Sequence, residues 1–219
     1  MKDENYHYYA FISYNHRDEK VAKWLQSRLE HYRLPSVARK EIGEDVKIRP
    51  VFRYVSDLGV AVLREKLKEE LEASKYLIVI CSPYSAKPNV KGEHWVNDEV
   101  KRFIALDRKD RIIPVIVDGI PGDERRECFC PALSEAEIAG IDFQKEKKSI
   151  GIQKIVANLL DLRPDILIQR YREERKKRCV RWFLGFLPLI ALTSLLALFA
   201  WDATRPVCNY YANYVDSFG

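Results

Sequence analysis

The feature that most constrains this chain is an uncharged segment near its C-terminal end. Residues Trp182–Trp201 read WFLGFLPLIALTSLLALFAW, twenty consecutive residues without a charged side chain. At roughly 1.5 Å per residue, a helix of this length spans about 30 Å, the thickness of a bilayer's hydrocarbon core. Tryptophan at both ends is typical of a membrane-spanning helix, because its ring favours the headgroup level. We therefore expect one membrane-spanning helix over residues 182–201.

A basic segment directly precedes this apolar one. Between Arg170 and Arg181, seven lysines and arginines stand against two glutamates, and the whole chain carries a formal charge of +5. The rest of the chain is therefore neutral overall, which is not the pattern of a nucleic-acid-binding protein. The basic flank also argues against the alternative for residues 182–201, a buried core helix. It predicts that residues 1–181 lie in the cytosol, with 163–181 as a basic helical linker and 202–219 as a short tail beyond the membrane.

In the preceding region, short β-rich runs alternate with amphipathic helical patterns. Tyr76–Cys81 and Ile112–Val117 are continuous apolar runs, as expected of strands buried on both faces. This alternation predicts an α/β fold with a parallel sheet and helices on both of its faces. Ligands bind such sheets beyond the carboxyl ends of the strands, so the loops of interest follow Tyr14, Tyr54 and Cys81.

Several classes of site lack their key residues. No G-x-G-x-x-G, G-x-x-x-x-G-K-[ST] or G-x-S-x-G sequence follows a predicted strand, so dinucleotide-fold, P-loop and hydrolase interpretations have no support. Cys128 and Cys130 lack the spacing and the partners of a zinc site, and the four histidines show no ligand pairing. We expect no metal, and reduced cysteines in the cytosolic region.

Four short motifs, in order along the chain, resemble those of the Toll/interleukin-1 receptor (TIR) domain family. They are Phe11–Tyr14 at the end of the first strand, Val51–Gly59 for the second strand and its BB loop, Leu77–Pro83 for the third strand and turn, and the W-x-x-x-E element Trp95–Glu99. The last element is that of family members that cleave NAD⁺. The resemblance runs over residues 6–162 and implies a flavodoxin-like TIR domain with a five-stranded parallel sheet.

The resemblance also implies an activity. Catalytic TIR domains hydrolyse or cyclise NAD⁺ and release nicotinamide, and their essential glutamate corresponds to Glu99. Nicotinamide leaves as a neutral molecule and needs no general acid, so one carboxylate that stabilises an oxocarbenium-like ribose is sufficient. NAD⁺ is the implied substrate, and neither a cofactor nor a metal is implied.

The same matching implies a set of substrate-binding residues. They are Asn15, His16, Gly59, Trp95 and Arg53. Trp95 stands four residues before Glu99 on the same helical face, where it either packs in the core or lines the pocket. Arg53 is a candidate phosphate partner, with an ion pair at a helix end as its alternative. His16 either contacts a phosphate or is an ordinary solvated loop residue.

A TIR domain followed by a basic linker and one membrane helix also resembles bacterial proteins in which a repeat domain follows the helix. Here 18 residues follow it, so we expect any sensor to be absent, truncated or supplied by a partner. The leading hypothesis is an antiviral NAD⁺ glycohydrolase of the bacterial inner membrane, activated by self-association of its TIR domains. The alternatives are a non-catalytic TIR scaffold or adaptor and, more weakly, a pore. The BB-loop Pro-Gly of receptor-type TIR domains is replaced by Leu58-Gly59, which favours the enzyme over the adaptor.

Overall fold

The computed structural model describes residues 6–35, 39, 48–54 and 60–203. The chain divides into two units, Met1–Arg170 and Tyr171–Gly219. The first contains the sheet and the helices packed on it, and the second contains most of a long C-terminal helix.

The first unit is built on a five-stranded sheet. Its strands are β1 (Tyr8–Ser13), β2 (Val51–Arg53), β3 (Ser74–Cys81), β4 (Ile112–Ile116) and β5 (Ile141–Asp142). Their order is β2-β1-β3-β4-β5, and every neighbouring pair is parallel. The predicted flavodoxin-like parallel sheet is thereby confirmed. The strand order reverses at β1 and β3, and ligands bind beyond the carboxyl ends of the strands at such a switch point.

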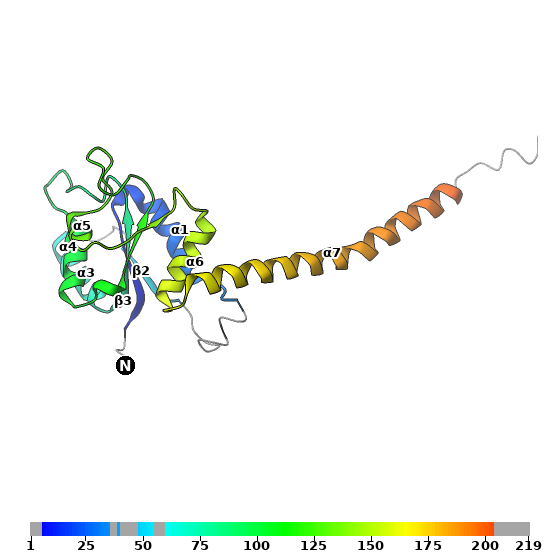
Figure 1. Cartoon of the computed structure of the whole chain (residues 1–219), viewed down its shortest axis with the longest axis horizontal. Helices are drawn as coiled ribbons and strands as arrows, with labels where there is room; N and C mark the ends of the chain where they lie inside the picture. Colours follow the sequence, from blue (N-terminus) through cyan, green and yellow to red (C-terminus); the bar gives the residue numbers. More distant parts are fainter. Residues whose placement is uncertain (1–5, 36–38, 40–47, 55–59, 204–219) are drawn as a thin grey trace, which may run out of the picture. The chain divides into compact units, whose positions relative to one another are not determined.

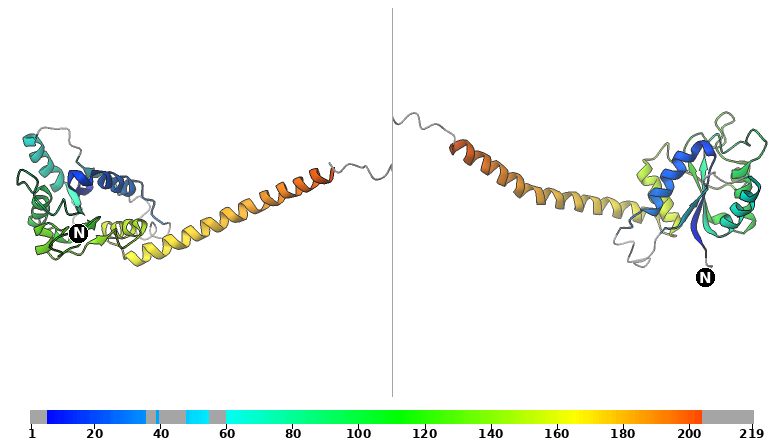
Figure 2. Two further views of the ribbon diagram at one scale, coloured as in Figure 1. Left: turned by 90° about the horizontal axis from the view of Figure 1, so that it is seen from above. Right: turned by 180° about the vertical axis from the view of Figure 1, so that it is seen from behind.

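Helices cover both faces of the sheet (Figure 1). One face carries α1 (Glu19–Glu30) and α6 (Lys148–Leu159), and the other carries α3 (Val60–Glu72), α4 (Trp95–Ala105) and α5 (Pro131–Glu135). The same two helical layers are visible from above and from behind in Figure 2. Because side chains of a strand alternate between faces, Ile12 belongs to the core cluster under α1 and α6, and Phe11 to the cluster under α3 and α4.

Some elements depart from a simple alternation of strands and long helices. Strand β5 has only two residues and pairs with β4 alone at the sheet edge. The segment between β4 and β5 contains α5, where Pro131 occupies the first turn and Leu133 is fully buried. Proline favours the first helical position, so Pro131 suits the start of this helix. Two 3-10 helices, η1 (His16–Asp18) and η2 (Lys109–Arg111), form single turns before α1 and β4.

The C-terminal helix α7 extends over Pro164–Ala203 and contains Pro188. Its part Cys179–Trp201, 23 residues with a mean hydropathy of 2.3, is long and apolar enough to cross a membrane and contains the predicted segment 182–201. Within it, Thr193 Oγ1 donates to the Ile190 carbonyl at 2.9 Å, so that hydroxyl is satisfied inside the helix. The predicted linker runs into this segment without a helix break, and the predicted tail lies outside the described residues from 204 on.

Candidate active site

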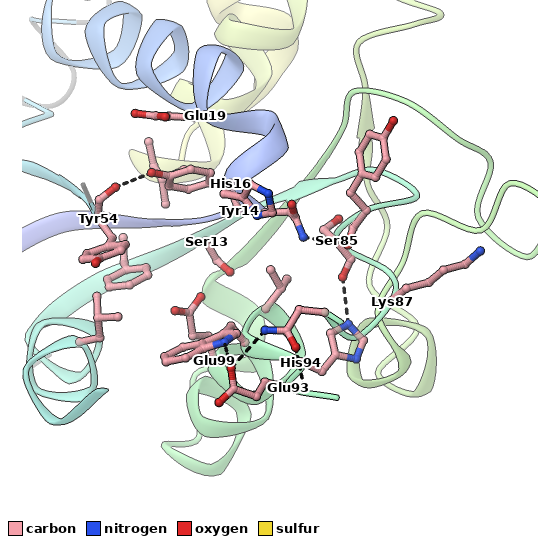
Figure 3. A pocket seen from close by; sticks show the side chains of 18 residues that line it. Ser13, Tyr14, His16, Glu19, Tyr54, Ser85, Lys87, Glu93, His94 and Glu99 are labelled. Carbon is pink, nitrogen blue, oxygen red and sulfur yellow. Dashed lines mark hydrogen bonds between the residues drawn. The ribbon is translucent and has the colours of Figure 1, made fainter. Parts of the chain in front are cut away.

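A cavity of about 240 Å³ lies at the carboxyl end of β1, between the η1 turn, the loop after β3 and the first turns of α4 (Figure 3). This is the edge of the sheet at which the sequence predicted the site. The side chains that line it are Phe11, Ile12, Ser13, Tyr14, Asn15, His16, Glu19, Tyr54, Leu67, Tyr84, Ser85, Lys87, Asn89, Glu93, His94, Trp95, Val96 and Glu99.

Three glutamates line this cavity, Glu19, Glu93 and Glu99, and Glu99 reaches it from the second turn of α4. The pKa of Glu99 is raised from 4.5 to about 7, mainly because burial disfavours the charged form; the Ser13 hydroxyl lowers the pKa and the charge of Asp98 raises it by smaller amounts. None of the ion pairs found among the described residues includes Glu99. Within the described part of the chain, the carboxyl therefore has no paired cation to compensate its charge, and near neutral pH it exists in both protonation states.

Trp95 forms a wall of the cavity and is held in place by its own loop. Its Nε1 donates to Glu93 Oε2 at 3.1 Å, and Asn89 Nδ2 donates to the same oxygen at 3.1 Å. Asn89 Oδ1 in turn accepts from the backbone N–H of Lys91 and Glu93, each at 2.9 Å. The indole also packs against the core cluster under α3 and α4. Both roles considered for Trp95, core packing and pocket lining, therefore apply to the same ring.

Asn15 and His16 come from the turn after β1. The Asn15 side chain accepts from the Arg17 backbone N–H at 3.1 Å and donates to the Tyr84 carbonyl at 3.1 Å, so it ties the β1 loop to the β3 loop. His16 is exposed and lines the cavity. Asn15 thus fixes the loop at the rim of the cavity, and the exposed His16 side chain is accessible to a ligand there.

Arg53 is absent from the lining of the cavity. Its Nε donates to Gln26 Oε1 and its Nη1 to Tyr14 Oη, both at 3.1 Å, and Nη1 lies 3.5 Å from Glu19 Oε1. Only 8% of its side chain is exposed. The structure therefore places Arg53 in its alternative role, an ion pair at the start of α1. Gly59, the other BB-loop candidate, lies outside the described residues.

Residues 10–156 match the TIR domain family. This chain belongs to that family. It is 30% identical, over 114 residues, to a protein of Actinoplanes sp. named NAD(+) hydrolase ApTIR; the alignment covers 51% of this chain and 14% of that protein. The chain thus spans only a small part of the relative's length. Among solved structures, the TIR domains of the activated Roq1 resistosome that recognises the pathogen effector XopQ are 18% identical, with a TM-score of 0.44, over 68% of this chain and 98% of that one.

Several residues of the TIR cavity were not predicted as site residues. The side chain of Ser13 opens into the cavity from the end of β1, and Lys87 and His94 reach the cavity from the segment between β3 and α4 (Figure 3). His94 Nε2 donates to the Ser85 carbonyl at 3.0 Å, which fixes the base of that segment. The sequence identified the loop after Cys81 as relevant, but it carried no signal for which of its side chains turn inward.

The TIR domain offers no metal site within its described part, where no group of three His, Cys, Asp or Glu side chains is arranged to hold an ion. Cys81, Cys128 and Cys130 are buried, free thiols, and burial raises the pKa of each. These cysteines are therefore poor nucleophiles at neutral pH and belong to the core under α3 and α4.

Proposed function

We propose that this TIR domain cleaves NAD⁺ between nicotinamide and ribose, with Glu99 as the catalytic residue. The observation that carries the proposal is a carboxyl that lines a cavity beyond β1, has no ion-pair partner among the described residues, and has a pKa raised to about 7 by burial. Perturbed carboxyls of this kind are typical of functional sites. The name of the Actinoplanes relative, an NAD(+) hydrolase, supports the same chemistry.

The chemistry fits one carboxylate. The bond between the anomeric carbon and the pyridinium nitrogen breaks, neutral nicotinamide leaves with the electron pair, and positive charge develops on the ribose. Glu99 in its ionised form stabilises that charge, and a preorganised group of this kind has most effect in a site that excludes water. A new C–O bond then forms to water, giving ADP-ribose and a proton, or to the substrate itself, giving a cyclic product. NAD⁺ is the substrate, and no cofactor takes part.

The cavity fits part of the dinucleotide. At about 240 Å³ it is smaller than the usual small-molecule site of roughly 300–1,000 Å³. We place the nicotinamide ribose beside Glu99 and Trp95 and the phosphates at the rim. The exposed side chains of His16 and Lys87 supply polar contacts and positive charge there.

Membrane attachment is a further part of the proposal. The apolar part of α7 would anchor the protein in the bacterial inner membrane, and its basic flank would keep the TIR domain in the cytosol. Confinement to a bilayer raises local concentration and thereby favours self-association of TIR domains. We propose that a signal from a separate sensor triggers this assembly and that NAD⁺ loss then acts as an antiviral response. Retention of the full chain in the membrane pellet after carbonate washing tests the anchor; release into the supernatant would contradict it.

The activity is tested with full-length protein in detergent, under crowding that promotes assembly, by following nicotinamide release from NAD⁺. Glu99→Gln keeps the size of the side chain but removes its charge, so we expect a loss on the order of 10²–10³ or more. Glu135→Gln, the same change at an exposed position on α5, serves as the matched control and should leave the rate unchanged. Full activity in Glu99→Gln would exclude Glu99 as the catalytic group, and assembly of the wild type without nicotinamide release would favour the scaffold function.

A further inference from the structure

Ser13 is a buried hydroxyl whose role the fold itself does not explain. The residue is 1% exposed at the last position of β1. Among the described residues its Oγ has no hydrogen-bond partner of ordinary geometry, although it lies near enough to the Glu99 carboxyl to lower the pKa of that group. A buried hydroxyl without a partner costs stability, so such a group in a folded protein calls for a functional reason. Ser13 also lines the cavity, and its hydroxyl points into it on the side of Glu99 (Figure 3).

The contrast with other buried serines sharpens this point. Ser74, at the start of β3, donates to the Glu70 carbonyl at 2.7 Å, and Ser82, just after β3, donates to Asp18 Oδ2 at 2.6 Å. Both hydroxyls are used by the fold. The Ser13 hydroxyl instead faces the Glu99 carboxyl from the neighbouring helix α4. A carboxyl accepts hydrogen bonds most strongly when it is ionised.

We propose that the Ser13 hydroxyl donates to the ionised Glu99 carboxylate and positions it, so that Ser13 acts on the reaction through Glu99 rather than by touching the substrate. The inference rests on the proposed function. Ser13 lies on β1 and Glu99 on α4, so the contact fixes the carboxylate to a strand that has neighbours on both sides in the sheet. It also lowers the pKa of Glu99, against the larger effect of burial.

Other charges lie around the same carboxyl. They are Asp98 on α4, Glu93, His94 and Lys87 from the segment before it, and His16 and Glu19 from the turn and helix after β1. Of these, Asp98 contributes to the shift of the Glu99 pKa, and it raises that pKa. The Ser13 hydroxyl acts in the opposite direction and lowers the pKa of Glu99. Removal of the Ser13 hydroxyl should therefore raise the pKa of Glu99, because the charged form of the carboxyl loses its hydrogen-bond donor.

Two measurements on the full-length protein in detergent test the inference. The first is the pH dependence of kcat/KM for nicotinamide release, whose acid limb should move up by about 0.5–1 pH unit in Ser13→Ala. The rate then falls by roughly 3–10-fold well below the pKa and is nearly unchanged well above it. Ser13→Thr retains a hydroxyl and should restore the wild-type limb. Ser74→Ala, which removes a buried hydroxyl far from the cavity, should leave the limb in place.

The second measurement does not depend on activity. In protein with ¹³C-labelled glutamate carboxyls, the Glu99 resonance is the one missing from Glu99→Gln, and its titration midpoint should rise in Ser13→Ala. An unchanged midpoint would overturn the inference, and so would a raised KM with an unchanged acid limb, which would mean that Ser13 binds the substrate. If the wild type releases no nicotinamide but the midpoint still rises, the proposed function fails while the Ser13–Glu99 contact stands.

Discussion

Two polar clusters flank the carboxyl end of β1, and successive residues of the chain face them. Ser13 faces Glu99 on the α4 side (Figure 3), whereas Tyr14 accepts a hydrogen bond from Arg53, which pairs with Glu19 on the α1 side. On the α1 side, Tyr14 Oη and Gln26 Oε1 both accept from the guanidinium, and Glu19 supplies the opposite charge. On the α4 side, the carboxyl has one hydroxyl beside it and no cation paired with it among the described residues.

The difference separates a structural cluster from a functional one. A buried charge whose donors all have acceptors holds elements together and gains little from a ligand. The charged form of a half-buried carboxyl such as Glu99 is unfavourable when no cation accompanies it, and a cationic ligand relieves that cost. The pyridinium of NAD⁺, the proposed substrate, carries such a charge. Four predictions test this distinction, beginning with the largest effect.

Arg53→Met should lower the free energy of unfolding by about 1–3 kcal/mol. The change keeps the length and apolar stem of the side chain but removes the donor to Gln26 Oε1, a half-buried acceptor. The measurement is chemical denaturation of the TIR domain within the full chain. Nicotinamide release by the folded variant should stay within a few-fold of the wild type, and a large rise in KM would return Arg53 to a phosphate-binding role.

Glu99→Gln should make the folded protein more stable rather than less, and the size of this effect should depend on pH. The pKa of Glu99 is raised from 4.5 to about 7 in the folded protein, so the stability that its protonated form contributes is complete below pH 4.5 and is lost as the pH rises to about 7. The amide does not titrate. The difference in melting temperature, Glu99→Gln minus wild type, should therefore rise between pH 4.5 and 7 and stay constant above pH 7. A constant difference across this range would mean that the carboxyl is not buried as described.

Lys87→Met should raise KM for NAD⁺ a few-fold with little change in kcat. Lys87 is exposed on the cavity rim and forms no ion pair among the described residues, so its charge remains available to a phosphate. The effect should shrink at high salt, because exposed charges are screened. Lys91→Met, in the same segment but outside the lining, is the control and should not change KM.

Glu19→Gln should have the smallest effect, within about 0.5 kcal/mol of the wild-type stability. The side chain of Glu19 is 55% exposed and its ion pair with Arg53 is 3.5 Å long, and pairs of this kind contribute little. Denaturation of this variant beside Arg53→Met separates the ion pair from the hydrogen bonds. A loss as large as that of Arg53→Met would show that the charge, rather than the bonds to Tyr14 and Gln26, stabilises the cluster.

The sequence predicted the position of a site residue correctly where that position follows from neighbours in the chain. Glu99 and Trp95 share a helical face by their spacing alone, and both line the cavity. Arg53 follows Phe52 on β2, and strand alternation directs it to the α1 face, away from Glu99. The sequence left both roles of Arg53 open because nothing near it in the chain indicates which helix covers which face.

The sequence by itself determined the parallel α/β architecture, the apolar segment near the C-terminal end and the W-x-x-x-E helix face. These features are periodic or continuous along the chain, so local patterns are sufficient to predict them. Only the tertiary structure decided that Ser13, Lys87 and Glu99 share one cavity and that Arg53 lies outside it. Those residues come from segments far apart in the sequence. Their meeting depends on strand order, on the loop after β3 and on the direction of each side chain, which are set by packing across the sheet rather than by neighbours in the chain.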